Sequence, residues 1–278
     1  MNVEKITDLK VVQDYIRMCN DGWEQGWHER NGGNLTYRLT ADELEACRPF
    51  FTAPGPWNAI GVQGENLAGE YFLTTGSGKY FRNVILDPAH SIGIVEINDK
   101  GDSWRIVWGL EGGARPTSEF PTHFMNHSVR LEATGGRCRV IYHAHTPHLI
   151  ALTYVLPLTA KAFSRALWQS ATECAVVFPE GVGIVPWLVP GGADIARATA
   201  GIMDQFSAVV WSHHGLFASG ADFDETFGLM HTVEKAAQIY ILAMSAAGGG
   251  PLRQTISDDE LRHLAQDFKV TLNEEFLD

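Results

Sequence analysis

The chain has 278 residues, of which 45% are hydrophobic and 19% are charged, so it carries enough apolar material for a sizeable core and is not a disordered protein. Lys and Arg number 21 against 33 Asp and Glu, which gives a net charge of −12. Nucleic-acid and anionic-membrane partners are therefore not expected, because both need clustered basic residues. Any bound anion must therefore be held by nearby groups that overcome the repulsion from the net negative charge of the molecule.

The four cysteines form no CxxC pair, which argues against a disulfide scaffold and against a four-cysteine zinc module. The N-terminus shows no basic segment followed by an apolar stretch, so no signal peptide is expected. No apolar run approaches the roughly 20 residues that a membrane helix needs. These patterns favour a cytoplasmic protein.

The first half of the chain is predicted to combine one helix with several strands. Apolar residues at three- and four-residue steps predict an amphipathic helix over 7–27, which the glycines of RNGGN end before the alternating strand LTYRL. Residues 48–69 are rich in Pro and Gly and predict a long irregular connection. The strands EYFLTT, SIGIVEIN and SWRIVWGL follow, and NDKGD joins the last two as a hairpin turn.

The second half is predicted to alternate helices with short apolar strands, namely RCRVIYHAH, CAVVF, VGIVPW, SAVVWSHH and GLFAS. Capping boxes at Asp222 to Glu225 and at Ser257 to Glu260 open a long helix and a last short one. There is no internal repeat and no long linker, so the pattern predicts a single α/β layer domain over residues 1–278 with a mixed sheet. The helices are predicted over 118–132, 147–170, 193–205 and 222–247.

Two histidines in IYHAH are candidate metal ligands. Residues two apart on a strand face the same side, so His143 and His145 would point one way; the alternative is that one or both simply pack or hydrogen-bond. A third histidine favours the metal, since three neutral imidazoles with an open fourth position are typical of a catalytic zinc site. His213 and His214 both end an apolar strand and face opposite sides, so only one can be this ligand, and spacing does not choose between them.

Two familiar metal motifs are excluded. His123 and His127 share a helix face in HFMNH, but Phe124 stands where a zincin needs a glutamate, and we expect these histidines to belong to an exposed or interface helix. A cupin site needs a glutamate a few residues after its HxH, whereas the first acidic residue after His145 is Glu173.

Two loops are candidates for holding a phosphate through backbone N–H groups. TTGSGKYF follows a strand, but Leu73, Tyr80 and Phe81 exclude a P-loop and a Rossmann fingerprint. RNGGN adds amides and two carboxamide side chains, and its alternative interpretation is a helix C-cap with a tight turn. Glu119 in PTSEF begins a helix, where its carboxylate either stabilises the helix end or, beside a metal, acts as a general base.

Taken together, these motifs resemble the class II aldolase/adducin family. TSE followed by HxH and then HG is specific to the superfamily, and the stretch from TEC through FPEGVGI and PW to VPG points to its rhamnulose-phosphate branch. The resemblance implies a three-layer α/β/α domain around a mixed, largely antiparallel sheet. It also implies zinc-dependent cleavage of L-rhamnulose 1-phosphate to dihydroxyacetone phosphate and L-lactaldehyde. The matching strings are WHERNGGNLTYRL, TGSGKYFRN, RPTSEFPTHF, YHAHT, LIALTYVL, ATECAVVFPEGVGIVPWLVPG, HHG and DETFGLM.

The resemblance also implies a role for individual residues. His143, His145 and His214 would bind zinc (Zn2+), one ion per subunit, so that His214 is the third ligand. Glu119 would be the catalytic acid/base, and Glu173 would reach the aldehyde half of the substrate from a neighbouring subunit of a fourfold-symmetric (C4) homotetramer with active sites at subunit interfaces. The phosphate and hydroxyls of the dihydroxyacetone phosphate half would be held by Asn31, Gly33, Asn34, Ser77, Gly78 and Ser118.

Two alternatives stand beside this interpretation. Another sugar-phosphate lyase or 4-epimerase of the same superfamily, acting on a fuculose or ribulose phosphate, would share the metal and phosphate motifs. A non-catalytic adducin-like interaction domain would keep the fold without the metal site, and the intact HAH, HHG and TSE motifs disfavour it.

Overall fold

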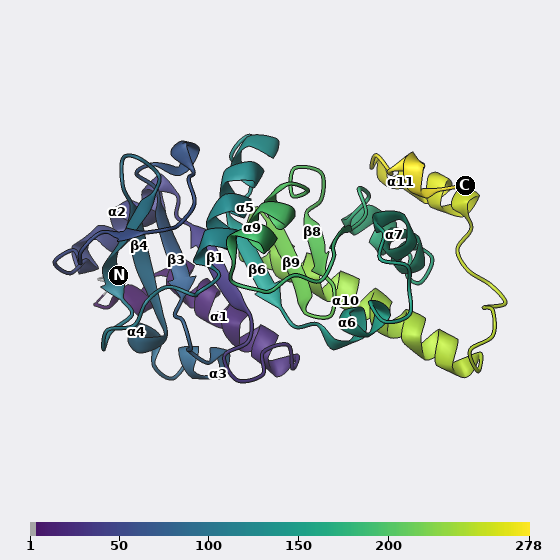
Figure 1. Ribbon diagram of the computed structural model, residues 1–278, viewed down its shortest axis with the longest axis horizontal. Helices are drawn as coiled ribbons and strands as arrows, with labels where there is room; N and C mark the ends of the chain where they lie inside the picture. The colour runs from purple at the N-terminus through teal and green to yellow at the C-terminus, as the bar shows by residue number, and fades with distance from the viewer. Residues whose placement is uncertain (1–3) are drawn as a thin grey trace.

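The computed structural model describes residues 4–278, and its centre is a nine-stranded sheet with helices on both faces (Figure 1). The strand order is β2-β5-β4-β3-β1-β6-β9-β8-β7, and neighbours are antiparallel except for the parallel pair β7 and β8. This is the mixed, largely antiparallel sheet that was predicted. The strands are β1 (Asn34–Arg38), β2 (Asn58–Ala59), β3 (Tyr71–Thr75), β4 (Ile92–Ile97), β5 (Ser103–Gly109), β6 (Val140–Ala144), β7 (Gly183–Val185), β8 (Ala208–Trp211) and β9 (Gly215–Gly220).

Helices flank this sheet and extend beyond its β7 end, where α7 and α11 lie at the end of the molecule opposite α2 and β4 (Figure 1). None of the helices within residues 4–278 combines the length and apolar character needed to cross a membrane. The α-helices are α1 (Lys10–Glu24), α2 (Ala41–Cys47), α3 (Phe81–Val84), α4 (Pro88–Ser91), α5 (Phe120–Ala133), α6 (Pro147–Leu152), α7 (Ala160–Trp168), α8 (Cys174–Val177), α9 (Ala193–Ala200), α10 (Phe223–Ala246) and α11 (Asp258–Phe268).

Alternation along the central strands places different side chains on the two faces of the sheet. In β6 the Tyr142 hydroxyl lies against α1, where a Cβ added to Gly22 would come within 2.0 Å of it. The next residue, His143, points to the opposite face and stacks on Phe217. In β1 Thr36 contacts α5 through its hydroxyl. Both faces are therefore buried, with α1 on one and α5 on the other.

Most predicted elements are present, and three expectations need correction. CAVVF was expected as a strand but forms the short helix α8, because Cys174 and Ala175 pack into the core from one helical turn and no strand pairs with them in the described chain. Asp222 caps α10 as predicted, but the Glu225 carboxylate bonds to Arg137 instead of closing a capping box. The Ser257 capping box is complete.

The third correction concerns His123 and His127, which were expected on an exposed or interface helix. Both are buried, at 0% and 1% exposure, because α5 packs against the sheet on the face that carries Thr36. The amphipathic pattern failed to indicate this, since an imidazole counts as polar in such a pattern although hydrogen bonds to three of the four ring nitrogens hold the two histidines inside the protein.

The topology brings several strand ends to one edge of the sheet, by which we mean the edge along which strands begin and end and not an outer strand. β1 begins where its antiparallel neighbours β3 and β6 end, and the register pairs Asn34 with His143. The turn between β8 and β9 lies at the same edge, because β9 is antiparallel to β6 and pairs Leu216 with Ala144. Loops that are up to 180 residues apart in the sequence, from Asn34 to His214, therefore meet at this edge.

Candidate active site

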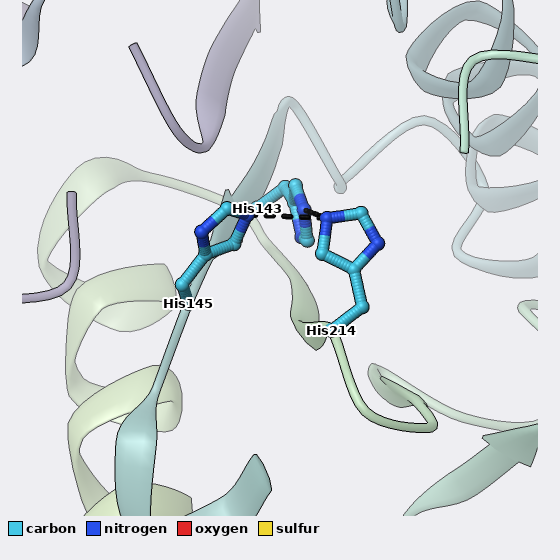
Figure 2. Close-up of side chains that lie close together, drawn as sticks. All are labelled: His143, His145 and His214. Atoms are coloured by element: carbon cyan, nitrogen blue, oxygen red, sulfur yellow. Dashed lines mark hydrogen bonds between the residues drawn. The ribbon is translucent and has the colours of Figure 1, made fainter. Parts of the chain in front are cut away.

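Three histidines converge at this edge of the sheet, as Figure 2 shows. His143 lies in β6, His145 follows the end of that strand, and His214 lies in the turn between β8 and β9. One nitrogen of each imidazole lies within 4.8 Å of the others. His143 and His145 share a side as the two-residue spacing predicts, while His214 arrives from a turn and not from the strand end that was expected.

Hydrogen bonds fix which nitrogen of His143 and of His145 faces the centre of this triad. His143 Nδ1 lies 3.1 Å from the carbonyl oxygen of Leu216, and His145 Nδ1 lies 2.6 Å from a carboxylate oxygen of Glu29. Each Nδ1 must donate its proton to these acceptors, which leaves both Nε2 atoms unprotonated and facing inward. His214 Nε2 lies 3.4 Å from His143 Nε2 and 3.1 Å from His145 Nε2.

These separations fit a single cation held by the three imidazoles. Zinc–nitrogen bonds of about 2.0–2.1 Å in tetrahedral geometry place two ligand nitrogens about 3.3 Å apart. The two Nε2 distances lie on either side of that value. Three neutral nitrogens facing one point, each ring oriented by a second hydrogen bond or by its turn, are the donor set of an open metal site.

The electrostatics keep the His143 and His214 rings neutral, which is the form that binds metal. Burial, together with the neighbouring His214 and His145, holds the pKa of His143 well below its usual range. Burial and His145 lower the pKa of His214 to about 4. Both imidazoles therefore offer a free lone pair at neutral pH.

Glu119 lies beside the triad. One carboxylate oxygen is 3.8 Å from His143 Nε2 and accepts a 2.8 Å hydrogen bond from the amide of Asn34. Although Glu119 is the N-cap residue of α5, its side chain makes no capping bond, so helix capping does not explain the carboxylate. Burial raises the pKa of Glu119, an effect that the Asn34 hydrogen bond and His145 oppose. The side chain is thus a buried carboxyl group with a raised pKa beside the triad.

The RNGGN loop runs directly against the triad. A Cβ on Gly32 would lie 2.8 Å from the His145 ring, and a Cβ on Gly33 would lie 2.7 Å from the carbonyl oxygen of His143. Gly33 also has a φ of +75°, which favours glycine. The two glycines therefore let the backbone approach the histidines closely, whereas the preceding Asn31 is exposed.

The other predicted phosphate residues lie on two segments bonded to each other at the same edge. The backbone N–H of Ser77 donates to the carbonyl of Arg115 at 2.8 Å, and that of Thr117 donates to Thr75 at 2.8 Å. Ser77, Gly78 and Ser118 are all exposed. The side chains of Ser77 and Ser118 and the backbone of Gly78 are therefore accessible from solvent, whereas the Ser77 N–H is already bonded to Arg115.

Two predicted residues lie apart from this group. His213 has a φ of +61° and its ring bonds to the Thr153 hydroxyl, so it points away from the triad. Glu173 is exposed at the start of α8, and no hydrogen bond or ion pair in residues 4–278 joins it to the triad.

Sequence reasoning assigned no role to several residues that support the site. Glu29 orients His145, and His28 packs against the loop with its ring stacked on Phe81. His123 bonds to Asn34, the partner of Glu119, and both His123 and His127 bond to the Thr36 hydroxyl. Their spacing of four on α5, directly after the TSE motif, was the available signal.

A histidine triad with a buried glutamate, set at the edge of a mixed sheet between glycine-rich loops, fits a metal-assisted enzyme. Residues 13–241 match the Class II Aldolase and Adducin N-terminal domain family, and the chain belongs to this family.

The chain is also similar to individual aldolases. The chain is 47% identical to a rhamnulose-1-phosphate aldolase of Klebsiella pneumoniae subsp. pneumoniae, over 96% of each chain. It is 47% identical to a rhamnulose-1-phosphate aldolase of Escherichia coli O139:H28, over 97% of each. A sugar-phosphate aldolase from Thermotoga maritima superposes with a TM-score of 0.74 at 26% identity, covering 87% of this chain and 98% of that one. An L-fuculose 1-phosphate aldolase shares the fold, with a TM-score of 0.59 at 21% identity over 97% and 98% of the chains.

Proposed function

We propose that this chain is an aldehyde-lyase that cleaves L-rhamnulose 1-phosphate to dihydroxyacetone phosphate and L-lactaldehyde, as in L-rhamnose catabolism. The observation that carries the proposal is the 47% identity to rhamnulose-1-phosphate aldolases along 96% of the chain. The convergence of three histidines and a buried glutamate at one sheet edge supports it.

His143, His145 and His214 would hold one zinc ion per subunit, and the spacing of their Nε2 atoms supports this choice. A bound zinc ion would supply Lewis-acid polarisation of the substrate oxygens next to the bond that breaks. Glu29 and the Leu216 carbonyl orient two of the rings through their Nδ1 protons.

Glu119 would manage the proton on carbon. When the carbon–carbon bond breaks, its electron pair stays on the dihydroxyacetone phosphate half, and the departing half loses its hydroxyl proton to become the aldehyde. Glu119 would deliver a proton to the carbon that holds the pair, and would remove it in the synthetic direction. Its position 3.8 Å from His143 Nε2 supports this role, because the reacting atoms must bind next to the triad.

The phosphate would lie between the two exposed loop segments on either side of Glu119. Backbone amides and small polar side chains there would hold it without a buried cation. The residues that we assign to the phosphate and hydroxyls of this half are Asn31, Gly33, Asn34, Ser77, Gly78 and Ser118.

Glu173 would act in a neighbouring subunit of a fourfold homotetramer, on the proton of the aldehyde oxygen. Its exposure supports this assignment, since a carboxylate that does not reach the triad of its own chain is free to reach another. Large apolar side chains exposed on the same half of the chain support an interface: Tyr154 at 71%, Val155 at 70%, Trp187 at 61% and Val189 at 68%. A cytoplasmic location and a single domain over residues 1–278 belong to the same proposal.

The test is a cleavage assay on rhamnulose, fuculose and ribulose 1- or 5-phosphates, with zinc content measured on the same sample. We expect rhamnulose 1-phosphate to be cleaved fastest, chelation to abolish cleavage and added zinc to restore it. Faster turnover of a fuculose or ribulose phosphate would contradict the substrate assignment. Trapping of a substrate–lysine adduct with borohydride would contradict the metal-dependent mechanism, because zinc chemistry needs no Schiff base.

A further inference from the structure

We propose that His123 is a positioning residue that fixes the Asn34 amide, and through it the Glu119 carboxylate, at the end of a one-directional hydrogen-bond chain. The chain runs from His127 through Thr36, His123 and Asn34 to Glu119. We call it the buried relay. It rests on the proposed function, since Glu119 is assigned there as the proton-transfer group.

All five members of the buried relay are at most 8% exposed. His127 Nε2 and His123 Nδ1 each lie 2.8 Å from the Thr36 hydroxyl oxygen. His123 Nε2 bonds to the carboxamide oxygen of Asn34, whose amide nitrogen lies 2.8 Å from Glu119 Oε2. The members come from β1, from α5 and from Glu119, the N-cap residue of α5.

The direction of the relay follows from what each atom can donate. Asn34 presents its amide to Glu119, since its carbonyl would repel the carboxylate, so its oxygen must accept from His123 Nε2–H. His123 is then unprotonated at Nδ1 and accepts the single proton of the Thr36 hydroxyl. That hydroxyl must therefore accept from His127 Nε2–H.

The far end of the relay supports the same direction. His127 Nδ1 is buried without a hydrogen-bond partner in the described structure. In this direction Nδ1 is an unprotonated acceptor, whereas the reverse direction would leave a buried N–H donor without a partner, which is the costlier defect. Both ends of the relay thus select one tautomer for each histidine.

Burial keeps both histidines neutral, which a one-directional relay requires. It lowers the pKa of His123 to about 3, and burial with the nearby His123 lowers the pKa of His127 well below its usual range. A doubly protonated His123 would leave two donors facing Thr36 and Asn34 and would lose the order of the relay.

The consequence is that the buried relay fixes the position of the Glu119 carboxylate. Asn34 alone could rotate its amide, but the His123 N–H holds the carbonyl end, so the N–H end stays aimed at Glu119. A carboxylate that must reach substrate carbon gains from such preorganisation, because a misplacement of about 1 Å can cost roughly 100-fold in rate.

The experiment compares four variants with the zinc-loaded wild-type enzyme. His123→Phe keeps a ring without a donor, and His123→Gln keeps an N–H at a similar reach. Thr36→Val removes the hydroxyl, and Thr226→Val is its matched control, because Thr226 is also 0% exposed but bonds to the Asp222 carbonyl of its own helix. The measurements are kcat and KM of cleavage, solvent deuterium exchange into dihydroxyacetone phosphate, zinc content and thermal unfolding.

We expect His123→Phe to lower kcat and deuterium exchange by about 10- to 100-fold with zinc retained and KM little changed. His123→Gln should recover most of the loss, and Thr36→Val should lose more turnover than Thr226→Val. Turnover of His123→Phe equal to that of Thr226→Val would overturn the proposal, as would an inactive but folded and zinc-loaded His123→Gln.

A spectroscopic readout decides the direction without any activity. In the wild-type protein labelled with ¹⁵N in its imidazoles, the His123 ring, assigned by its loss in His123→Gln, should carry its proton on Nε2. A proton on Nδ1 would contradict the buried relay even if His123→Phe failed to fold. Full activity of Glu119→Gln would instead contradict the proposed function and leave the tautomer result standing, so the two failures are distinguishable.

Discussion

Glu119 takes its chemistry from neighbours in space. In the sequence it is a carboxylate at a helix start, where the helix dipole is a sufficient reason for it. In the structure it makes no capping bond and lies between Asn34 and His143. Local sequence could not distinguish a helix-stabilising carboxylate from a general base beside a metal, because both interpretations place Glu119 at the same helix position.

Glu119→Gln should retain zinc and lose turnover by about 10²–10⁴-fold, because the amide keeps the shape but cannot carry the proton. Zinc is expected to stay, since the three converging nitrogens belong to histidines. Glu43→Gln is the matched control: Glu43 closes the capping box of α2, and a glutamine can make those bonds. Steady-state turnover with zinc content decides, and near-normal rates in Glu119→Gln would remove it from the catalytic role.

At the scale of elements, the loop between α1 and β1 shows what pattern can and cannot predict. RNGGN was expected to end the helix predicted over 7–27, but α1 ends at Glu24 with Gln25 as its C-cap, so the loop glycines do not cap it. Gly33 is explained instead by a close approach, since its Cβ would lie 2.4 Å from His28 Nδ1 and 2.7 Å from the His143 carbonyl. That contact arises only when β1 pairs with β6.

Gly33→Ala should therefore lower both stability and turnover. Gly26→Ala is the matched control, because Gly26 has a similar φ of +78° but open space around its Cβ position. Backbone strain alone should cost Gly26→Ala about 1–2 kcal/mol. Gly33→Ala adds the collision with His28, so it should unfold at lower urea concentration and lose at least about tenfold in turnover. Equal stability and activity in the two variants would contradict the close approach.

At the scale of the whole molecule, the charge of −12 argues against a nucleic-acid partner but not against a small phosphate ligand. Local backbone amides act within a few ångströms, whereas the mean field is screened beyond about 10 Å. In the proposed tetramer, the site of each subunit is complete only when a neighbouring subunit contributes its Glu173. The exposure of Glu173 and of the large apolar side chains supports this arrangement.

Mixing Glu119→Gln with Glu173→Ala tests this arrangement. Each variant alone should be nearly inactive, but about a quarter of the sites in randomly mixed tetramers would hold both native carboxylates. We expect activity to recover after subunit exchange and not after mixing without exchange. Absence of recovery in tetramers shown to be hybrid would contradict a shared site.

The sequence by itself determined the alternation of helices and strands, the two-residue spacing of His143 and His145, and the family. These features depend on periodicity and on motifs, which are local in the chain. It misassigned CAVVF, whose β-like composition yields to core packing in α8. It also misjudged His123 and His127, whose partners lie on β1.

Only the tertiary structure decided which atoms meet. Sheet pairing brings Asn34 opposite His143, and the turn before β9 directs His214 inward while a left-handed backbone turns His213 away. The order of protons in the buried relay likewise follows from four contacts between α5 and β1 and the residue that begins α5. Distance and direction between residues far apart in sequence depend on the packed fold, and periodicity carries no information about them.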